Sequence, residues 1–306
     1  MSIRSILRCL DVILLYHRVA DLDSDPWSLC ITPAHFSEHL EVLRKCVPIS
    51  LRQVSLSGRY GAKRPRVAVT FDDGYTDNLY TARPLLERYD IPATFFVVTG
   101  YVGQGREFWW DELEKIVFGP EILSETVQFP SASGTRCFNT SEFSRSSLYM
   151  SLYRDLQPMR HEERRNVLDQ LLECSHQSPS VRESHRIMSA EEVCGLAISK
   201  LVEIGAHTVT HPRLSSQPLE GQRAELQNGK AWLEELLGRP IASFSYPFGG
   251  SGHYAAETVS AVREAGYLRA CTTAAHRVAN GDNVHELPRF DASDMTGSDL
   301  EKLLLS

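Results

Sequence analysis

The sequence predicts an α/β protein with a parallel sheet or barrel. Short apolar and β-branched runs alternate with helical patterns in about seven units, which is typical of strands joined by crossover helices. The 306 residues, 42% hydrophobic and 23% charged, are enough for a sizeable core. In such folds functional side chains lie where strands end and loops begin, so the strand ends are the candidate sites.

Strands are expected at the runs richest in apolar and β-branched side chains. VILLY is apolar up to His17, RVAVTF ends on Asp72, and ATFFVVT follows Pro92. The expected strands span residues 12–19, 66–73, 93–99, 201–208, 243–249, 268–274 and 285–291.

Helices are expected where apolar side chains recur with helical spacing. Residues 33–46 place Phe36, Leu40 and Leu43 on one face. Residues 107–119 stop at Gly119, in line with the frequency of glycine just past helix ends. Further helices are expected at residues 79–89, 224–238 and 253–266.

Residues 120–190 interrupt the alternation. A Ser/Thr-rich stretch is followed by two runs with apolar stripes, separated by Pro158. Because both runs can bury a face, we expect them to pack as a helical insertion within one domain spanning residues 1–306. Two roles of the insertion stay as alternatives: an addition to the surface without a function, and a lid or partner surface with one. The apolar positions are Leu148, Leu152 and Leu156 in the first run and Val167, Leu168, Leu171 and Leu172 in the second.

Composition and charge narrow the classes of partner and compartment. The formal net charge of −7 provides no basic surface for nucleic acid, whose binding depends on phosphate neutralisation. No run approaches the roughly 20 apolar residues of a membrane span, and Arg8 and Asp11 interrupt the only stretch that resembles a signal peptide. The seven cysteines are odd in number and include no CxxC pair, which favours reduced thiols. We therefore expect a cytoplasmic protein without a nucleic-acid partner or transmembrane segment; the oligomeric state is open.

Two adjacent carboxylates, Asp72 and Asp73, end the strand RVAVTF. Successive side chains of a strand point to opposite faces, so both can reach one cavity only if the chain bends, which Gly74 allows. Two carboxylates this close in a poorly solvated pocket would repel each other unless a cation lay between them. The pair therefore points to a metal ion.

The other ligands of such a metal would be His207 and His211, which follow the expected strand VEIGA. A spacing of four residues places two side chains on one face of a helical turn, a common arrangement for a shared metal. Pro212 disfavours helix at His211, so we expect a single turn or a loop. Taken alone, the pair could be surface or hydrogen-bonded core histidines; together with the Asp-Asp-Gly strand end, it favours metal ligands.

Three motifs together resemble the polysaccharide deacetylase family, carbohydrate esterase family 4, which shares the NodB homology domain. TFDDGY at 70–75 and HTVTH at 207–211 are similar to its first two motifs, and SYPFG at 245–249 to its third. The resemblance extends from residue 12 to about residue 291, apart from the insertion. It implies a distorted (β/α)7-type barrel and metal-dependent removal of an acetyl group from an N-acetylated sugar.

The resemblance also implies roles for the matching residues. Asp73, His207 and His211 would hold a divalent metal, Zn²⁺ by preference with Co²⁺ or Ni²⁺ as alternatives, and Asp72 would be the general base. The metal would acidify a water and polarise the amide carbonyl, and Asp72 would remove the water's proton. The backbone N–H of Phe248 would help to hold the oxyanion.

A general acid is needed to protonate the leaving nitrogen. Many family members use a histidine in a C-terminal motif, which this sequence lacks. The apolar strand VILLY instead leads to His17, and barrels with circularly related strand order can place a first strand where a last one would lie. The exopolysaccharide- and glycolipid-type branch of the family resembles this arrangement, so we expect His17 to be the acid. A hydrogen-bonded core histidine is the alternative.

The third motif departs from the family pattern, because Ser245 stands where an arginine is common. Arg289, in LPRFD near another strand end, is expected to pair with Asp72 or Asp291 and keep the base ionised. A barrel-end or surface ion pair of little energetic value is the alternative.

Aromatic side chains are expected to contact the sugar, because their rings offer flat apolar faces. The candidates are Tyr75, Trp109, Trp110 and Tyr246, besides Phe248. Adjacent residues of a helix cannot share a face, so at least one of Trp109 and Trp110 is expected in the core.

The expected substrate is an N-acetylated amino sugar in a glycan, glycolipid or sugar precursor. The lack of a recognisable export signal favours an intracellular precursor over a finished wall polymer. Two other classes of function stay open, a metal-dependent amide hydrolase for a non-sugar substrate and a non-catalytic sugar-binding relic. The intact Asp72 argues against the relic, because a binding module would not need a spare base.

Overall fold

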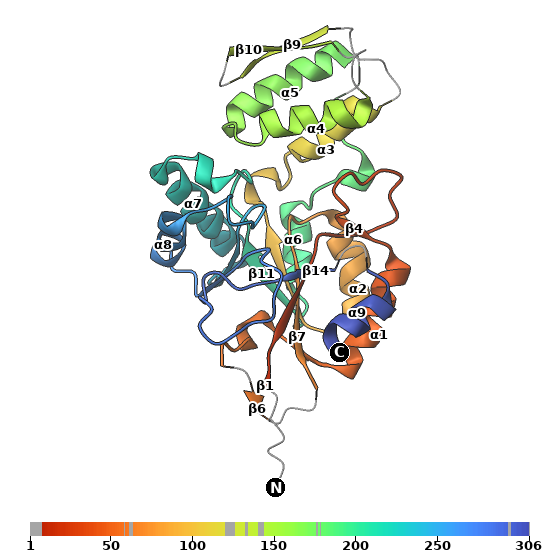
Figure 1. The fold of residues 1–306 in the computed structure, drawn as a ribbon, viewed down its shortest axis with the longest axis vertical. Helices are drawn as coiled ribbons and strands as arrows, with labels where there is room; N and C mark the ends of the chain where they lie inside the picture. Colours follow the sequence, from red (N-terminus) through yellow and green to blue (C-terminus); the bar gives the residue numbers. More distant parts are fainter. Residues whose placement is uncertain are drawn as a thin grey trace.

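A curled sheet of parallel strands forms the centre of the computed structural model (Figure 1), which describes residues 8–57, 59–60, 64–119, 126–131, 134–139, 144–175, 177, 179–292 and 295–305. Its strands run in the order β13-β12-β11-β8-β7-β2-β14, with β5 beside the start of β7. Leu287, shortly before β14, forms a parallel bridge to Cys271 of β13, so the two edges of the sheet approach each other. The predicted α/β barrel with parallel strands is confirmed. The strands are β2 (Val12–Tyr16), β5 (Val47–Ile49), β7 (Arg66–Phe71), β8 (Ala93–Val97), β11 (Val202–Ala206), β12 (Ser243–Ser245), β13 (Arg269–Cys271) and β14 (Phe290–Asp291).

Several strands are shorter than the sequence predicts, and where they begin and end matters for the site. β2 stops at Tyr16 and a separate strand, β3 (Arg18–Val19), pairs with β4 (Cys30–Ile31), so His17 lies at the break. β12 stops at Ser245, which leaves the rest of SYPFG in a loop. β14 contains only Phe290 and Asp291 of the predicted 285–291.

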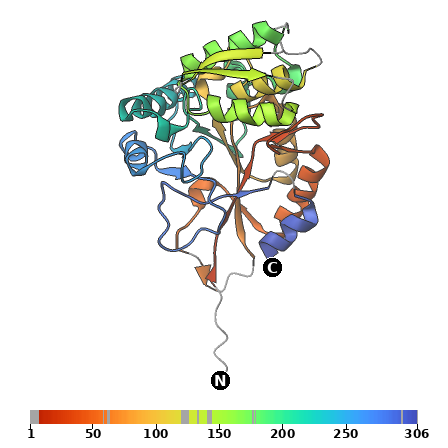
Figure 2. The same ribbon diagram turned by 45° about the horizontal axis from the view of Figure 1, so that its top comes forward.

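Helices cover the outside of the sheet (Figures 1 and 2). α1, α2 and α9 lie on one side of it, and α7 and α8 lie on the other. The five predicted helices are present; α6, α9 and β5 were not predicted. Within the described ranges, no helix is both long and apolar enough to cross a membrane. The bounds are α1 (Pro33–Lys45), α2 (Arg83–Tyr89, after the π-helical turn Asn78–Ala82), α3 (Trp109–Phe118), α6 (Ala190–Ala197), α7 (Leu219–Leu237), α8 (Ala256–Glu264) and α9 (Gly297–Leu305).

The two helices of the segment within residues 120–190 lie at the end of the molecule opposite β1 (Arg8–Cys9) (Figure 1). The helices α4 (Arg145–Leu156) and α5 (His161–Ser175) match the two apolar runs and pack on α3. An antiparallel hairpin of β9 (Thr126–Ser131) and β10 (Gly134–Asn139) was not predicted, because its strands are short and their few apolar residues lie in a stretch rich in Ser, Thr and Gly. The buried faces of α4 and α5 share one apolar cluster with Trp109 and Tyr75, so the insertion packs on α3 and on the loop that follows β7.

Candidate functional site

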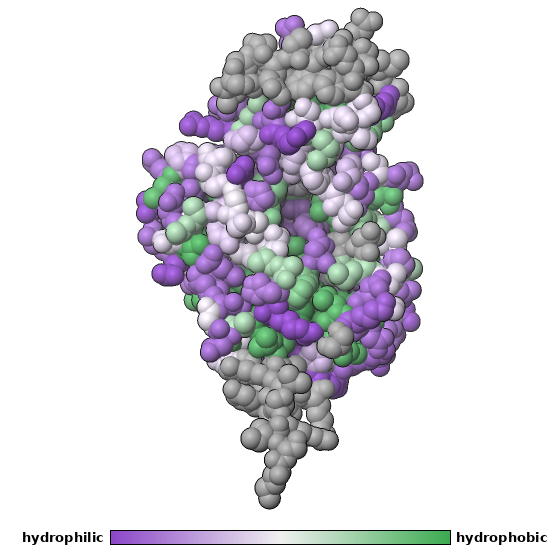
Figure 3. All heavy atoms as spheres, in the orientation of Figure 1, coloured by the Kyte–Doolittle hydropathy of each residue, from purple (hydrophilic) through white to green (hydrophobic). Residues whose placement is uncertain are grey.

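One pocket brings together most of the predicted site residues. It has a volume of about 480 Å³ and lies at the C-terminal ends of β2, β7, β11 and β12. On the face drawn in Figure 3, the surface is hollowed below the insertion. Arg289, Tyr75 and Trp109 are the predicted site residues that do not line the pocket. The predicted residues that line it are His17, Asp72, Asp73, Trp110, His207, His211, Tyr246 and Phe248.

Two left-handed residues turn both carboxylates into this pocket. Asp73 has φ 76° and Gly74 has φ 92°, which ends the regular alternation of β7. The Asp72 N–H donates to the Tyr16 carbonyl at 3.0 Å, and the Val98 N–H donates to the Asp73 carbonyl at 3.3 Å. The neighbouring strands therefore hold the bend that Gly74 was expected to allow.

The histidines lie on a strained loop after β11 and not on a helical turn. Thr208 has φ 67° and His211 has φ 52°, and left-handed residues other than glycine cost on the order of 1 kcal/mol each. The Glu225 carboxylate of α7 holds this loop, because it accepts hydrogen bonds from the N–H groups of Val209 and Thr210 at 2.7 and 2.8 Å and from the Thr210 hydroxyl at 2.6 Å.

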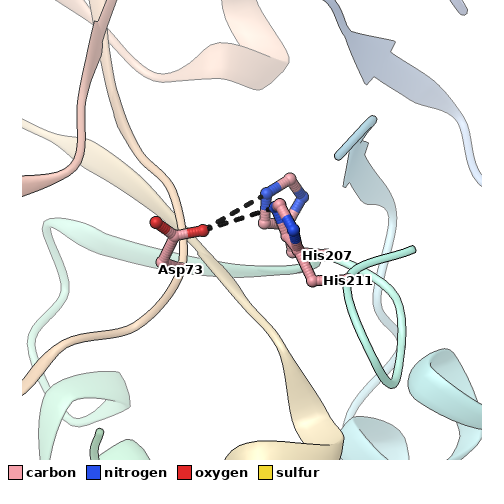
Figure 4. A group of neighbouring side chains, drawn as sticks. All are labelled: Asp73, His207 and His211. Atoms are coloured by element: carbon pink, nitrogen blue, oxygen red, sulfur yellow. Dashed lines mark ion pairs between the residues drawn. The ribbon is translucent and has the colours of Figure 1, made fainter. Parts of the chain in front are cut away.

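Asp73, His207 and His211 form a compact buried group (Figure 4). The Nε2 atoms of both histidines lie 3.6 Å from Oδ1 of Asp73, and one ligand atom from each residue falls within 4.8 Å of the others. The Nδ1 of His207 lies 2.7 Å from the Ser245 carbonyl, so Nδ1–H donates there and the Nε2 lone pair faces Asp73. The Nδ1 of His211 is buried without a hydrogen-bond partner in the described part of the chain.

The electrostatics of this group fit a cation. Burial raises the pKa of Asp73 well above its usual range, and Asp72 raises it further. Burial lowers the pKa of His207 to about 4, although Asp72 opposes the shift, and it lowers the pKa of His211 well below its usual value. Both imidazoles are therefore neutral near pH 7 and offer electron pairs beside a carboxylate that lacks a positive partner. A divalent metal supplies that charge, so the donor set fits one.

Asp72 is bound by Arg289 on its other side. The guanidinium Nη1 and Nη2 donate to the two carboxylate oxygens at 2.8 and 2.7 Å. Of the two partners expected for Arg289, Asp72 and Asp291, the structure therefore shows Asp72. Ser245 Oγ donates to Asp72 at 3.0 Å and accepts from Arg289 at 2.8 Å. Thr272 and Thr70 accept the remaining Arg289 N–H groups, so all five donors of this fully buried side chain are used. Burial opposes ionisation of Asp72, but Arg289 overrides it and holds the pKa of the carboxyl well below its usual range.

His17 is held at the break between β2 and β3. Asn78 Nδ2 donates to the His17 carbonyl at 2.8 Å, and the neighbouring Arg18 forms an ion pair with Asp77 at 3.0 Å. The Nδ1 of His17 is buried and has no hydrogen-bond partner in the described ranges. Burial lowers the pKa of His17, whereas Asp72 and Asp291 raise it. The imidazole lines the pocket and can exchange a proton there.

Three of the predicted aromatic residues line the pocket. The Trp110 indole N–H donates to the Tyr75 hydroxyl at 3.0 Å, and its ring centroid lies 4.8 Å from that of His211. Phe248 has φ 62°, and its N–H donates to no residue in the described part of the chain. The Tyr246 hydroxyl donates to the His285 carbonyl at 2.9 Å. Trp109 is fully buried, so it is the core member of the tryptophan pair.

Tyr75 lies beneath the pocket, so the expected contact with a substrate is not supported. The turn at Gly74 sends its side chain into the core, where the hydroxyl donates to Asp111 at 2.6 Å. The Arg18 guanidinium lies 4.1 Å from the ring centroid. Tyr75 therefore supports Trp110 from below.

The pocket also contains residues that the sequence did not indicate. Trp27 comes from the loop between β3 and β4, and His253 follows the third motif. Four more lie on α4 or at its C-terminal cap, where their spacing of three and four residues was a detectable signal for a second helix face. They are Met150, Tyr153, Arg154 and Gln157.

Comparison with known families matches residues 59–166 and 184–270 to the model described as polysaccharide deacetylase, which is more than half of the chain. The chain belongs to the polysaccharide deacetylase family. The matched ranges contain Asp72, Asp73, His207 and His211, whereas His17 and Arg289 lie outside them. YxkH of Bacillus subtilis (strain 168), which its name assigns to the same family, is 28% identical over 127 residues. That match covers 40% of this chain and 44% of YxkH, so the chain matches less than half of this curated relative.

Solved structures of other deacetylases share the fold. The deacetylase PplD of Streptococcus pyogenes, in complex with acetate, has a TM-score of 0.62 at 17% identity, over 98% of this chain and 100% of PplD. IcaB from Ammonifex degensii has a TM-score of 0.62 at 19% identity, over 96% of each chain. At these identities the likeness concerns the fold.

Proposed function

We propose that this polysaccharide deacetylase family member is a metal-dependent hydrolase that removes the N-acetyl group from an amino sugar in a glycan, glycolipid or sugar precursor. The observation that carries the proposal is the buried group Asp73, His207 and His211 beside the Asp72–Arg289 pair in one pocket. Family membership supports an acetylated sugar as substrate. A cytoplasmic location stays a prediction.

Asp73, His207 and His211 would hold the metal, with Zn²⁺ preferred and Co²⁺ or Ni²⁺ as alternatives for two imidazoles and one carboxylate. When bound, the metal would supply Lewis-acid chemistry to the amide carbonyl and the attacking water. The neutral state of both imidazoles supports this role, because protonated histidines cannot bind a metal.

Asp72 would act as the general base and take a proton from the attacking water. Its low pKa keeps it ionised, and Arg289 and Ser245 orient it without occupying every acceptor site of the carboxylate. The Phe248 N–H would donate to the developing oxyanion, which its lack of a partner within the described chain supports.

His17 would protonate the leaving nitrogen. Its position in the pocket and its buried, unpartnered Nδ1 support a role in proton transfer over a structural one. The Arg18–Asp77 ion pair and the Asn78 hydrogen bond would hold the backbone that presents it.

The activity is tested with purified protein, by metal analysis and by acetate release from N-acetylated sugars and small amides. We expect about one divalent metal per chain, loss of acetate release on chelation and recovery with Zn²⁺, Co²⁺ or Ni²⁺. Metal binding without acetate release from any sugar would contradict the proposal. Release from a non-sugar amide alone would identify a different amide hydrolase.

Replacing His17 by Ala is expected to lower kcat by about 10²- to 10⁴-fold, the usual contribution of a general acid. The metal content should match wild type, because His17 is not in the ligand group. Replacing His35, a histidine outside the pocket, by Ala is the matched control. A His17→Ala protein with its metal and near-normal turnover would exclude the acid role.

A further inference from the structure

Arg164 of α5 is a charged side chain that lies completely inside the protein. It is 0% exposed and forms no ion pair with any residue in the described ranges. Its guanidinium lies 4.8 Å from the centroid of the Trp109 ring, and Nη2 donates to the Thr210 carbonyl at 3.3 Å. Burial lowers the pKa of Arg164, although Tyr101 and Glu225 oppose the shift. A buried charge without an ion pair is costly, which points to a role other than stabilising the fold.

Thr210 lies in the loop between the two proposed histidine ligands, and two helices hold it from different sides. Its N–H and hydroxyl donate to the Glu225 carboxylate of α7 at 2.8 and 2.6 Å, whereas its carbonyl accepts from Arg164 of α5. Glu225 therefore fixes the peptide bond before Thr210, and Arg164 fixes the peptide bond that leads into His211. Rotation of this second peptide bond would change the φ of His211, which is 52° and left-handed, and with it the direction of the His211 side chain.

His211 depends on its backbone for orientation more than His207 does. The Nδ1 of His207 lies 2.7 Å from the Ser245 carbonyl, a contact that fixes its ring. The Nδ1 of His211 has no hydrogen-bond partner among the described residues. Trp110 and Phe248 pack against the His211 ring, with centroids 4.8 and 4.7 Å away, but neither contact is a hydrogen bond. The backbone of the loop therefore aims the His211 ring at the other two ligands (Figure 4).

The insertion also contacts the loop that provides Asp73. The Met188 N–H donates to the Gly74 carbonyl at 3.1 Å, and the Thr76 N–H donates to the Arg186 carbonyl at 3.0 Å. Residues 186–188 end the inserted segment, and α5 lies in its middle. The insertion therefore forms hydrogen bonds with both loops that carry proposed metal ligands.

We propose that Arg164 is a positioning residue of the metal site, which together with Glu225 forms a clamp on Thr210 and sets the direction of His211. The proposal rests on the proposed function, because it requires that Asp73, His207 and His211 hold the metal. Through this clamp the insertion would raise the affinity for the metal, since a ligand that is already aimed loses less freedom on binding. Neither helix could do so alone, because each fixes only one of the two peptide bonds of Thr210.

The metal affinity of the full-length protein tests the clamp. Metal is first removed from wild type, Arg164→Met and Arg164→Lys, and the dissociation constants for Zn²⁺ and Co²⁺ are then measured by competition with a chelator. We expect Arg164→Met to weaken binding by about 10- to 100-fold, the usual effect of losing a group that orients a metal ligand. The absorption bands of bound Co²⁺ should shift, because the geometry of the ligands changes. Arg164→Lys keeps a donor for the Thr210 carbonyl and should recover part of the affinity.

Arg165→Met is the matched control on the same helix. Arg165 forms ion pairs with Glu112 and Asp169. Its replacement should leave both dissociation constants at their wild-type values, even where urea unfolding shows a loss of stability. Wild-type affinity and an unchanged Co²⁺ spectrum in Arg164→Met would overturn the clamp. An equal loss of affinity in Arg165→Met would also overturn it, because the effect would then follow stability alone.

Glu225→Gln is a second variant, which carries the test if Arg164→Met does not fold. It weakens the charged hydrogen bonds to the Thr210 N–H and hydroxyl and should also lower the metal affinity, whereas an unchanged affinity would overturn the clamp. The expected losses support the clamp even if wild type releases no acetate from any sugar, which would contradict only the proposed function. A wild type that binds no divalent metal would contradict both.

Discussion

Replacing Asp72 by Asn is expected to lower kcat for acetate release by about 10²- to 10⁴-fold while the protein keeps its metal. An amide cannot take the proton of the attacking water, whereas the three proposed ligands are unchanged. The measurement is kcat together with metal content per chain. Asn keeps the shape of the side chain but leaves the buried Arg289 charge without its carboxylate, so urea unfolding of this variant is measured in parallel to separate the missing base from an altered pocket.

Asp169→Asn is the matched control for this variant. Asp169 lies on α5 with its side chain 49% exposed, pairs with Arg106 and Arg165, and does not line the pocket. Its replacement should leave kcat at the wild-type value. Near-normal turnover of Asp72→Asn would exclude the base role, and loss of the metal from this variant would make Asp72 part of the metal site.

Replacing Arg289 by Met is expected to cost about 3–5 kcal/mol of unfolding free energy at pH 7, because it leaves a buried carboxylate unpaired. The guanidinium is fully buried and makes two hydrogen bonds to Asp72. The double variant Arg289→Met with Asp72→Asn should recover much of this loss, since no buried charge then remains. Urea unfolding of the three variants and wild type measures both effects.

The same replacement is expected to move the acidic limb of the pH–rate profile to higher pH. Arg289 holds the pKa of Asp72 below its usual range in the fold. The stabilisation from a carboxylate with a depressed pKa is complete above the pKa of the unfolded chain, about 3.9, and is lost as pH falls through the folded value. Without Arg289, burial is the largest influence left on Asp72 and raises its pKa, although His207 and His17 still lower it, so the base becomes protonated at a higher pH than in wild type. An acidic limb that does not move would exclude the role of Arg289 in keeping the base ionised.

Local sequence patterns predicted the parts of the protein that depend on neighbouring residues. The β-branched run before Asp72 predicted a strand, and Gly74 predicted the bend that brings two carboxylates into one cavity. The stripes at Leu148 and Leu168 predicted α4 and α5. These patterns work because backbone preference and the periodicity of burial act over a few residues.

Local patterns failed where a side chain's direction or partner is set by the surroundings. Tyr75 follows the Asp-Asp-Gly turn, but the left-handed φ of Asp73 and Gly74 sends it into the core. The β9–β10 hairpin has only a short apolar alternation at Val127 and Phe129, and its pairing is visible only in three dimensions. The Glu225 contacts that hold the histidine loop come from the following helix and carry no motif.

The sequence by itself determined the barrel and the four residues Asp72, Asp73, His207 and His211 of the candidate site. The tertiary structure decided that Arg289, 217 positions away, pairs with Asp72, and that Trp27 and α4 form one wall of the pocket. The physical reason is that strand propensity and turn chemistry are local, whereas an ion pair or a pocket wall depends on which distant segments the parallel sheet brings to the same end of the barrel.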